Sequence, residues 1–139
     1  MERLARARLL VGTAAEGEAL VSPEPLSFWG GYDHLTGEII DRRHPLTGAR
    51  AAGRILALPY ARGSSTTTAV LLEAVRAGTA PAAILTTEAD TFFALASIVA
   101  EEMYRKPFAV GVVESEGFAR LRTGQWLRLE DDGTIYFVR

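Results

Sequence analysis

The sequence predicts a single α/β domain in which parallel central strands and two crossover helices are closed by β segments from both termini. Three continuous apolar runs carry this prediction, because such runs are typical of strands buried on both faces. They span residues 55–58, 82–86 and 108–113. A helical pattern separates each run from the next, and short strand–helix–strand links favour right-handed crossovers between parallel strands. Because 139 residues suit one domain, we assign 1–139 to a single unit.

Both flanks of this centre are expected to be β structure. Short strands are predicted at 9–11 and 19–21, joined through Glu16-Gly17. A hairpin is predicted over 126–138, because two apolar segments flank Asp131-Asp132-Gly133, a combination typical of tight turns. These segments supply the strands that complete the sheet on either side of its parallel centre.

Two amphipathic helices are expected between the central strands. The first covers 67–78, with a narrow polar face and Gly78 as its stop. The second runs from about 89 to 105, and Thr87-x-x-Asp90 matches a capping box at its start. The apolar stripe that we expect to face the core in this second helix consists of Phe92, Leu95, Ala96, Val99 and Met103.

The composition limits the function classes. A formal net charge of −2 with scattered arginines argues against a nucleic-acid partner, which would require a clustered basic surface. No apolar run approaches the roughly 20 residues of a membrane span, so no membrane partner is expected. The absence of cysteine fits a reducing, cytoplasmic location and leaves this chain without thiolates for a zinc or iron–sulfur site. We therefore expect no metal ligands and no cofactor in this chain.

The segment 58–68 is the most informative for chemistry. An apolar run ends at Pro59, Arg62 and Gly63 follow, and five consecutive hydroxyl residues lead into a helical pattern. The first turn of a helix has unpartnered N–H groups and a partial positive charge, which suit a carboxylate or phosphate. An extended N-cap is the simpler alternative, because Ser and Thr commonly begin helices. The candidate ligands are Arg62, Gly63, Ser64, Ser65 and Thr66.

Common nucleotide and hydrolase motifs are missing from this segment. The turn has one glycine where a dinucleotide fingerprint has three, and it has no lysine for a phosphate loop. Gly63-Ser64-Ser65-Thr66 is not the Gly-x-Ser-x-Gly of a nucleophile elbow. A stand-alone phosphate-binding α/β enzyme is therefore disfavoured.

The remaining polar and aromatic candidates lie in the first half of the chain. His34 is expected to be an exposed loop histidine, whereas His44 belongs to a denser polar cluster. Arg42 or Arg43 in that cluster can bind an anion, although a solvated turn is the simpler interpretation. Trp29, followed by two glycines, is expected to be a core aromatic rather than a lid over a ligand.

Five segments together resemble the swivel domain, or small subunit, of the aconitase X family. They are SPEPLSFWGGYD at 22–33, TGEIIDRRHPL at 36–46, GRILALP at 53–59, RGSS at 62–65 and GTAPAAIL at 78–85. Members of this family are dehydratases, with activities similar to cis-3-hydroxy-L-proline dehydratase and mevalonate 5-phosphate dehydratase. The resemblance implies the swivelling β/β/α fold of aconitases for most of the chain.

The resemblance also implies a partner and a catalytic residue. The family's small subunit docks onto a cysteine-containing large subunit that holds an iron–sulfur cluster or an iron ion. Its catalytic serine corresponds to Ser64, which would remove the proton α to the substrate carboxylate. Aconitases have an arginine two positions after this serine, whereas Thr66 stands here. Carboxylate binding by an arginine at that place is therefore not implied.

The function expected from these observations is that of the small subunit of a hydro-lyase. It would dehydrate a small hydroxy acid by α-proton abstraction and metal-assisted loss of the hydroxyl, and would be active only with a large subunit. The favoured substrate is cis-3-hydroxy-L-proline, because a phosphorylated substrate calls for more cations than Arg62 alone. The alternatives are mevalonate 5-phosphate as substrate and, from another class, a non-catalytic anion-binding module.

Overall fold

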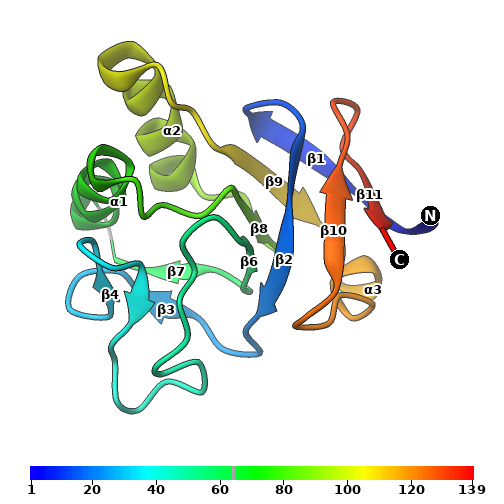
Figure 1. Cartoon of the computed structure of the whole chain (residues 1–139), viewed down its shortest axis with the longest axis horizontal. Coiled ribbons are helices and arrows are strands. Elements are labelled where there is room, and N and C mark those ends of the chain that lie inside the picture. The colour runs from blue at the N-terminus through cyan, green and yellow to red at the C-terminus, as the bar shows by residue number, and fades with distance from the viewer. Residues whose placement is uncertain (64) are drawn as a thin grey trace.

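Seven strands close into a barrel at the centre of the computed structural model, which describes residues 1–63 and 65–139 (Figure 1). Around the barrel the strands follow the order β1-β11-β10-β2-β6-β8-β9. Their bounds are β1 Glu2–Val11, β2 Ala15–Val21, β6 Ile55–Ala57, β8 Ala83–Thr86, β9 Ala109–Val113, β10 Trp126–Leu129 and β11 Thr134–Phe137.

The parallel half of the barrel confirms the predicted α/β centre. β6 pairs in parallel with β8, and β8 pairs in parallel with β9. Helix α1 (Ser65–Ala77) connects β6 to β8, and α2 (Thr91–Tyr104) connects β8 to β9. β2 adds a further parallel strand beside β6. The three apolar runs are therefore strands, each slightly shorter than expected.

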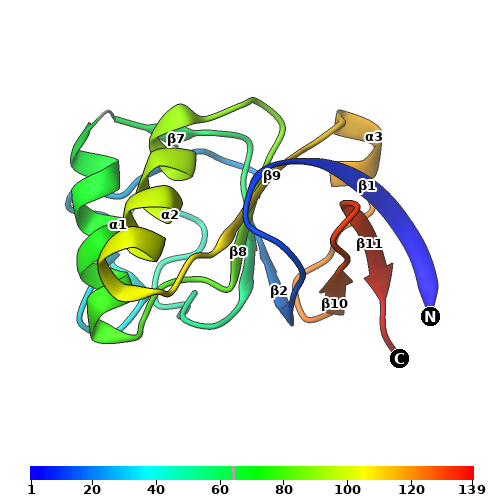
Figure 2. The ribbon, with the colours of Figure 1, turned by 90° about the horizontal axis from the view of Figure 1, so that it is seen from above.

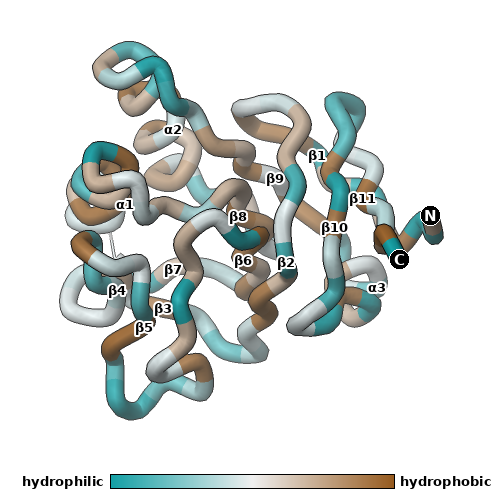
Figure 3. Tube along the Cα trace, viewed as in Figure 1, coloured by the Kyte–Doolittle hydropathy of each residue, from teal (hydrophilic) through white to brown (hydrophobic). Residues whose placement is uncertain are grey.

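The continuous apolar runs are explained by two cores, one on each side of the parallel strands. The two helices lie together on one side of the parallel strands, and β10 and β11 lie on the other, across the barrel (Figure 2). Along β6, Leu56 faces the helices, whereas Ile55 and Ala57 face the barrel interior, and all three are fully buried. Burying each large apolar side chain stabilises the fold by about 1.5–3 kcal/mol. Hydrophobic residues accordingly concentrate along these central strands (Figure 3).

The N-terminal strands are longer than predicted. β1 begins at Glu2 rather than at residue 9, and Glu16-Gly17 lies within β2 rather than in the turn. In β1 the buried side chains of Leu4, Ala5 and Ala7 are interrupted by exposed arginines, which hide the strand in a search for apolar runs. The turn between the two strands lies at 12–14 instead.

Helix α2 is rotated relative to the predicted stripe. Leu95 and Met103 are 47% and 60% exposed, so their assignment to the core is wrong. The helix carries more apolar residues than one face can bury, and apolarity alone therefore does not identify its inner face. The side chains that do face the core are Phe93, Ala96, Ser97 and Ala100.

The predicted capping box at the start of α2 is also wrong. Asp90, not Thr87, is the N-cap, and its carboxylate accepts hydrogen bonds from the N–H groups of Phe92 at 2.9 Å and Phe93 at 3.0 Å. Satisfying these otherwise unpartnered donors stabilises a helix start by about 1 kcal/mol. Thr87 is occupied elsewhere, because its hydroxyl donates to the Pro59 carbonyl at 3.1 Å.

Two small sheets and a short helix lie outside the barrel. β3 (Leu26–Ser27) pairs in parallel with β7 (Ala61–Arg62), and β4 (Tyr32–Asp33) forms a hairpin with β5 (Glu38–Ile39). Helix α3 (Ser115–Phe118) follows β9. The predicted C-terminal hairpin is confirmed by the antiparallel pairing of β10 with β11. Within the described residues, no helix is long and apolar enough to cross a membrane.

Two glycine substitutions test the closure of the barrel. Gly133 and Gly124 both have left-handed backbones, at φ +90° and +96°, but a Cβ on Gly133 would lie 2.0 Å from the Ala7 carbonyl oxygen of β1, whereas the space around Gly124 is open. We expect Gly124→Ala to cost about 1–2 kcal/mol through backbone strain. Gly133→Ala must also displace β1 and should cost about 3 kcal/mol or more. If urea unfolding gave the two variants equal losses in the free energy of unfolding, this close approach of the hairpin to β1 would be contradicted.

Candidate functional site

The candidate site is the junction between β7 and α1. Arg62 ends β7, Gly63 follows, and α1 begins at Ser65, two residues earlier than predicted. The described candidates Arg62, Gly63, Ser65 and Thr66 are all exposed at this junction. Ser64, the candidate catalytic residue, lies outside the described residues. The structure therefore gathers four of the five predicted site residues in one exposed segment.

Gly63 is required by the backbone of the junction. Its φ of +127° lies in a region that residues with a side chain rarely adopt. A Cβ at this position would also lie 3.1 Å from the Thr67 hydroxyl oxygen. The glycine thus allows the backbone to change direction immediately after β7.

The junction lies at the carboxyl edge of the parallel strands. The segments that follow β6, β8 and β9 leave the sheet at this edge, and both the junction and α3 lie along the upper margin of Figure 2. The Thr87 N–H and hydroxyl each donate to the Pro59 carbonyl oxygen at 3.1 Å, which ties the loop after β8 to the segment leading into β7. Ligands of α/β sheets bind outside this edge.

The hydroxyl run divides into two parts with different roles. Thr67 and Thr68 are buried, and the Thr68 hydroxyl donates to the Phe92 carbonyl at 3.0 Å, which ties α1 to α2. Ser65 and Thr66 remain exposed. The first turn of α1 contains no acidic side chain, so no carboxylate there competes with an anion for the positive end of the helix dipole.

Strand β3 borders the junction and leads to an exposed tryptophan. In the parallel pairing of β3 with β7, Ser27 lies opposite Arg62. Phe28 is fully buried, but Trp29 is 69% exposed, so its predicted place in the core is wrong. The neighbouring glycines were the available signal, because Gly30 has φ +77° and turns the chain outward. Trp29 is therefore a candidate contact residue on the surface rather than a core aromatic.

Neither histidine is part of the junction. His34 lies in a turn as predicted but is partly buried rather than exposed, and its carbonyl accepts a hydrogen bond from the Thr79 hydroxyl at 2.5 Å. His44 is buried, at 7% exposure, and its ring contacts backbone groups of two loops. Arg42 and Arg43 are exposed beside it in the turn after β5. The solvated-turn interpretation of the two arginines fits their exposure.

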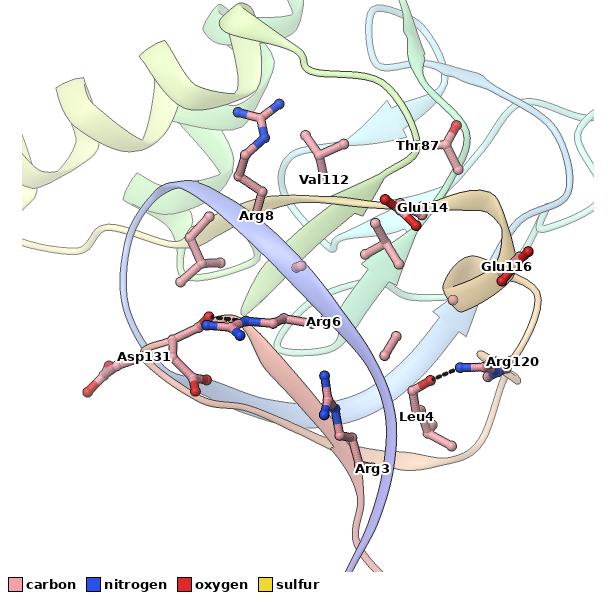
Figure 4. A pocket seen from close by; sticks show the side chains of 16 residues that line it. Arg3, Leu4, Arg6, Arg8, Thr87, Val112, Glu114, Glu116, Arg120 and Asp131 are labelled. Atoms are coloured by element: carbon pink, nitrogen blue, oxygen red, sulfur yellow. Dashed lines mark hydrogen bonds between the residues drawn. The ribbon is translucent and has the colours of Figure 1, made fainter.

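A broad depression of about 1070 Å³ lies at the same edge, on the barrel side (Figure 4). Thr87 lines it, and the hydroxyl of the same residue donates to the carbonyl of Pro59, three residues before Arg62. The Arg6 Nε donates to the Asp132 carbonyl at 3.2 Å, and Arg120 donates to the Leu4 carbonyl at 3.0 Å. The walls of the depression carry both positive and negative side chains. They are Arg3, Arg6, Arg8, Arg120, Glu114, Glu116, Asp131 and Asp132.

Two side chains have displaced pKa values, and both serve the fold. Burial raises the pKa of Tyr32, whose hydroxyl donates to the Thr79 carbonyl at 2.7 Å. A hydrogen bond from the Thr134 backbone N–H lowers the pKa of Asp132 in the β10–β11 turn. These shifts reflect local packing and turn formation rather than a proton-transfer pair.

The donor set of the chain does not fit a metal centre. The sequence has no cysteine, and outside position 64 no three His, Asp or Glu side chains gather in a group that could hold a metal ion.

Comparisons with known proteins agree with this architecture. A family model described as the aconitase X swivel domain matches residues 4–137. The crystal structure of Thermococcus kodakaraensis aconitase X in its holo-form superimposes with a TM-score of 0.85 at 32% identity, covering 97% of this chain and 98% of that one. The likeness extends over nearly the whole chain and confirms the fold that the sequence resemblance implied.

The similar proteins include two kinds of dehydratase. The cis-3-hydroxy-L-proline dehydratase of Pseudomonas aeruginosa is 48% identical over 124 residues, which cover 89% of this chain and 21% of that protein. The phosphomevalonate dehydratase small subunit of Thermococcus gammatolerans is 38% identical over 131 residues, or 94% of each chain. The chain thus spans about a fifth of the first relative and nearly all of the second.

Proposed function

The chain belongs to the aconitase X swivel-domain family, and we propose that it supplies the proton-abstracting half of a dehydratase active site. It would act as the small subunit, or swivel domain, of a hydro-lyase. The other half would come from a cysteine-containing large subunit. Support comes from the family match over residues 4–137 and from relatives that are named dehydratases.

The β7–Gly63–α1 junction is the observation that carries this proposal. Dehydration of a hydroxy acid begins with removal of the proton next to its carboxylate, and Ser64, by its resemblance to the family's catalytic serine, would take that proton. A serine hydroxyl is too weakly acidic to lose its own proton at neutral pH. Its alkoxide, which is the form that acts as a base, therefore has to be stabilised by its surroundings. The backbone N–H groups at the start of α1 and the exposed Arg62 guanidinium would stabilise its alkoxide, and exclusion of water by a docked partner would strengthen both interactions.

The neighbouring exposed groups would bind the substrate. The carboxylate of a hydroxy acid is small enough to contact the first turn of α1, where Ser65 and Thr66 offer hydroxyls and backbone N–H groups. Arg62 supplies a positive charge immediately before the glycine. An iron–sulfur cluster or iron ion held by the large subunit would provide the Lewis acid for the departing hydroxyl.

We further propose cis-3-hydroxy-L-proline as the substrate. The 48% identity to the Pseudomonas dehydratase supports this choice, as does the single cation of the 62–66 segment. Phosphomevalonate is the alternative, supported by the match over 94% of the Thermococcus small subunit. Steady-state assays of the assembled pair on both compounds decide between them. Turnover of phosphomevalonate with cis-3-hydroxy-L-proline inert would overturn the choice.

Replacing Ser64 by alanine should abolish dehydration and leave the fold intact. Losing a helix cap costs about 1 kcal/mol, which a domain stable by roughly 5–15 kcal/mol tolerates. Losing the base should lower kcat by at least about 10²–10⁴-fold, the usual contribution of positioned proton transfer. The measurement is kcat of the assembled pair together with the thermal midpoint of the small subunit.

Ser65→Ala is the matched control for this experiment. It removes the hydroxyl next along the chain, at the first residue of α1, and should mainly raise KM with kcat close to wild type. Near-normal turnover by Ser64→Ala, with assembly confirmed, would show that Ser64 is not the base.

Docking of the large subunit should cover the carboxyl edge of the sheet. We expect amide hydrogen exchange at residues 60–68 to slow when the large subunit is added, because this exposed junction becomes buried between the subunits. Residues 78–82, at the opposite, amino end of β8, are the internal control and should exchange at an unchanged rate. Slowing confined to 78–82 would place the interface on the other side of the molecule.

A further inference from the structure

His44 joins two loops that are distant in the sequence. Its Nδ1 accepts a hydrogen bond from the Leu46 N–H at 3.0 Å, and its Nε2 lies 3.1 Å from the Pro25 carbonyl oxygen. A ring nitrogen that accepts cannot carry a proton, so these contacts assign the neutral tautomer with hydrogen on Nε2. The Nε2–H group therefore donates to Pro25, with the Ser22 hydroxyl oxygen at 3.4 Å as a weaker neighbour.

The loop that His44 holds leads directly into β3. The Ser22 N–H donates to the Ala57 carbonyl of β6 at 2.8 Å, and the Ser22 hydroxyl donates to the Glu24 carbonyl at 2.6 Å. The loop is therefore fixed to the barrel at its start. Its end is Pro25, whose carbonyl belongs to the peptide group before Leu26. The bond from His44 fixes this end.

Strand β3 in turn supports the strand that carries the site. β3 and β7 form a two-stranded sheet of their own, outside the barrel, and lie side by side in Figure 1. Leu26 pairs with Ala61 and Ser27 with Arg62, and the next residue along the chain is Gly63. A two-stranded sheet is only marginally stable by itself, so its position depends on the contacts that anchor it.

We propose that His44 is a positioning residue for the dehydration reaction. Its Nε2–H bond to the Pro25 carbonyl fixes the chain at the entry to β3, next to the core anchors Leu26 and Phe28, and β3 pairs with β7, which leads to the turn at Gly63. This inference rests on the proposed function, because its consequence is the alignment of the Ser64 segment with the substrate. A displacement of about 1 Å in such a segment can lower the rate about 10²-fold.

Two substitutions separate the two hydrogen bonds of the ring. In His44→Asn the short amide can still accept from the Leu46 N–H, as in an Asx turn, but does not extend to Pro25. In His44→Gln the longer amide can donate to Pro25 from near the position of Nε2. Both variants replace the buried neutral ring by the same neutral carboxamide group. They differ by one methylene in the length of the side chain, so each is a close control for the other.

The variants are measured as assembled pairs with the large subunit, with kcat, KM and thermal midpoint recorded for each. We expect His44→Gln to keep kcat within a few-fold of wild type and His44→Asn to lose about 10- to 100-fold in kcat with little change in KM. Wild-type kcat in His44→Asn overturns the inference. So does an equal loss in both variants that follows their thermal midpoints, which indicates a purely structural histidine.

Amide exchange provides a readout that does not depend on activity. Exchange at residues 60–63 should be faster in His44→Asn than in His44→Gln, and equal rates overturn the inference. If the wild-type pair dehydrates neither compound, the proposed function fails, while exchange still decides the positioning role. If His44→Asn does not fold, His44→Gln decides: kcat close to wild type supports the role, and a loss of tenfold or more at an unchanged thermal midpoint overturns it.

Discussion

The double pairing of β1 is the constraint on which the rest of the structure depends. Residues 7–11 of this strand pair with β9, residues 2–6 pair with β11, and the registers shift along both pairings. One strand thereby joins the last parallel strand to the C-terminal hairpin and leaves no free edge in the main sheet. The parallel strands are held from both sides, so their carboxyl edge presents its loops from a rigid frame.

The candidate site combines this frame with a short segment outside the barrel, which consists of β7 and the turn at Gly63. Helix α1 is anchored along its length, because its inner face is buried against the sheet and Thr68 bonds to α2. The segment that enters the helix is different, since β7 lies outside the barrel and its strand pairing is with the two residues of β3. The segment is held by the buried Leu26 and Phe28 in and after β3, by the bonds of Thr87 to Pro59, and by the contact of His44 with Pro25. Such a division allows a rigid fold to present a small segment whose geometry is set by a few hydrogen bonds.

Elements whose pattern and burial agree could be predicted from the sequence. The parallel strands are buried on both faces, and the C-terminal hairpin has a turn signal between apolar segments. The site segment was found because Gly63 and the hydroxyl run mark a helix start. The inner face of α2 could not be predicted, because Leu95 and Phe93 are equally apolar and only packing separates them. The roles of Trp29 and His44 depend on loops that meet only in three dimensions.

The central claim is that Ser64 removes the substrate's α-proton at an active site completed by a large subunit. The most direct measurement is a structure of the assembled enzyme with the hydroxy acid, or an unreactive analogue, bound. The predicted result is a Ser64 hydroxyl oxygen within about 3–3.5 Å of the substrate α-carbon, the separation of a near-attack arrangement. A side chain of the large subunit at that carbon, with the β7–α1 junction turned away from the substrate, would contradict the claim.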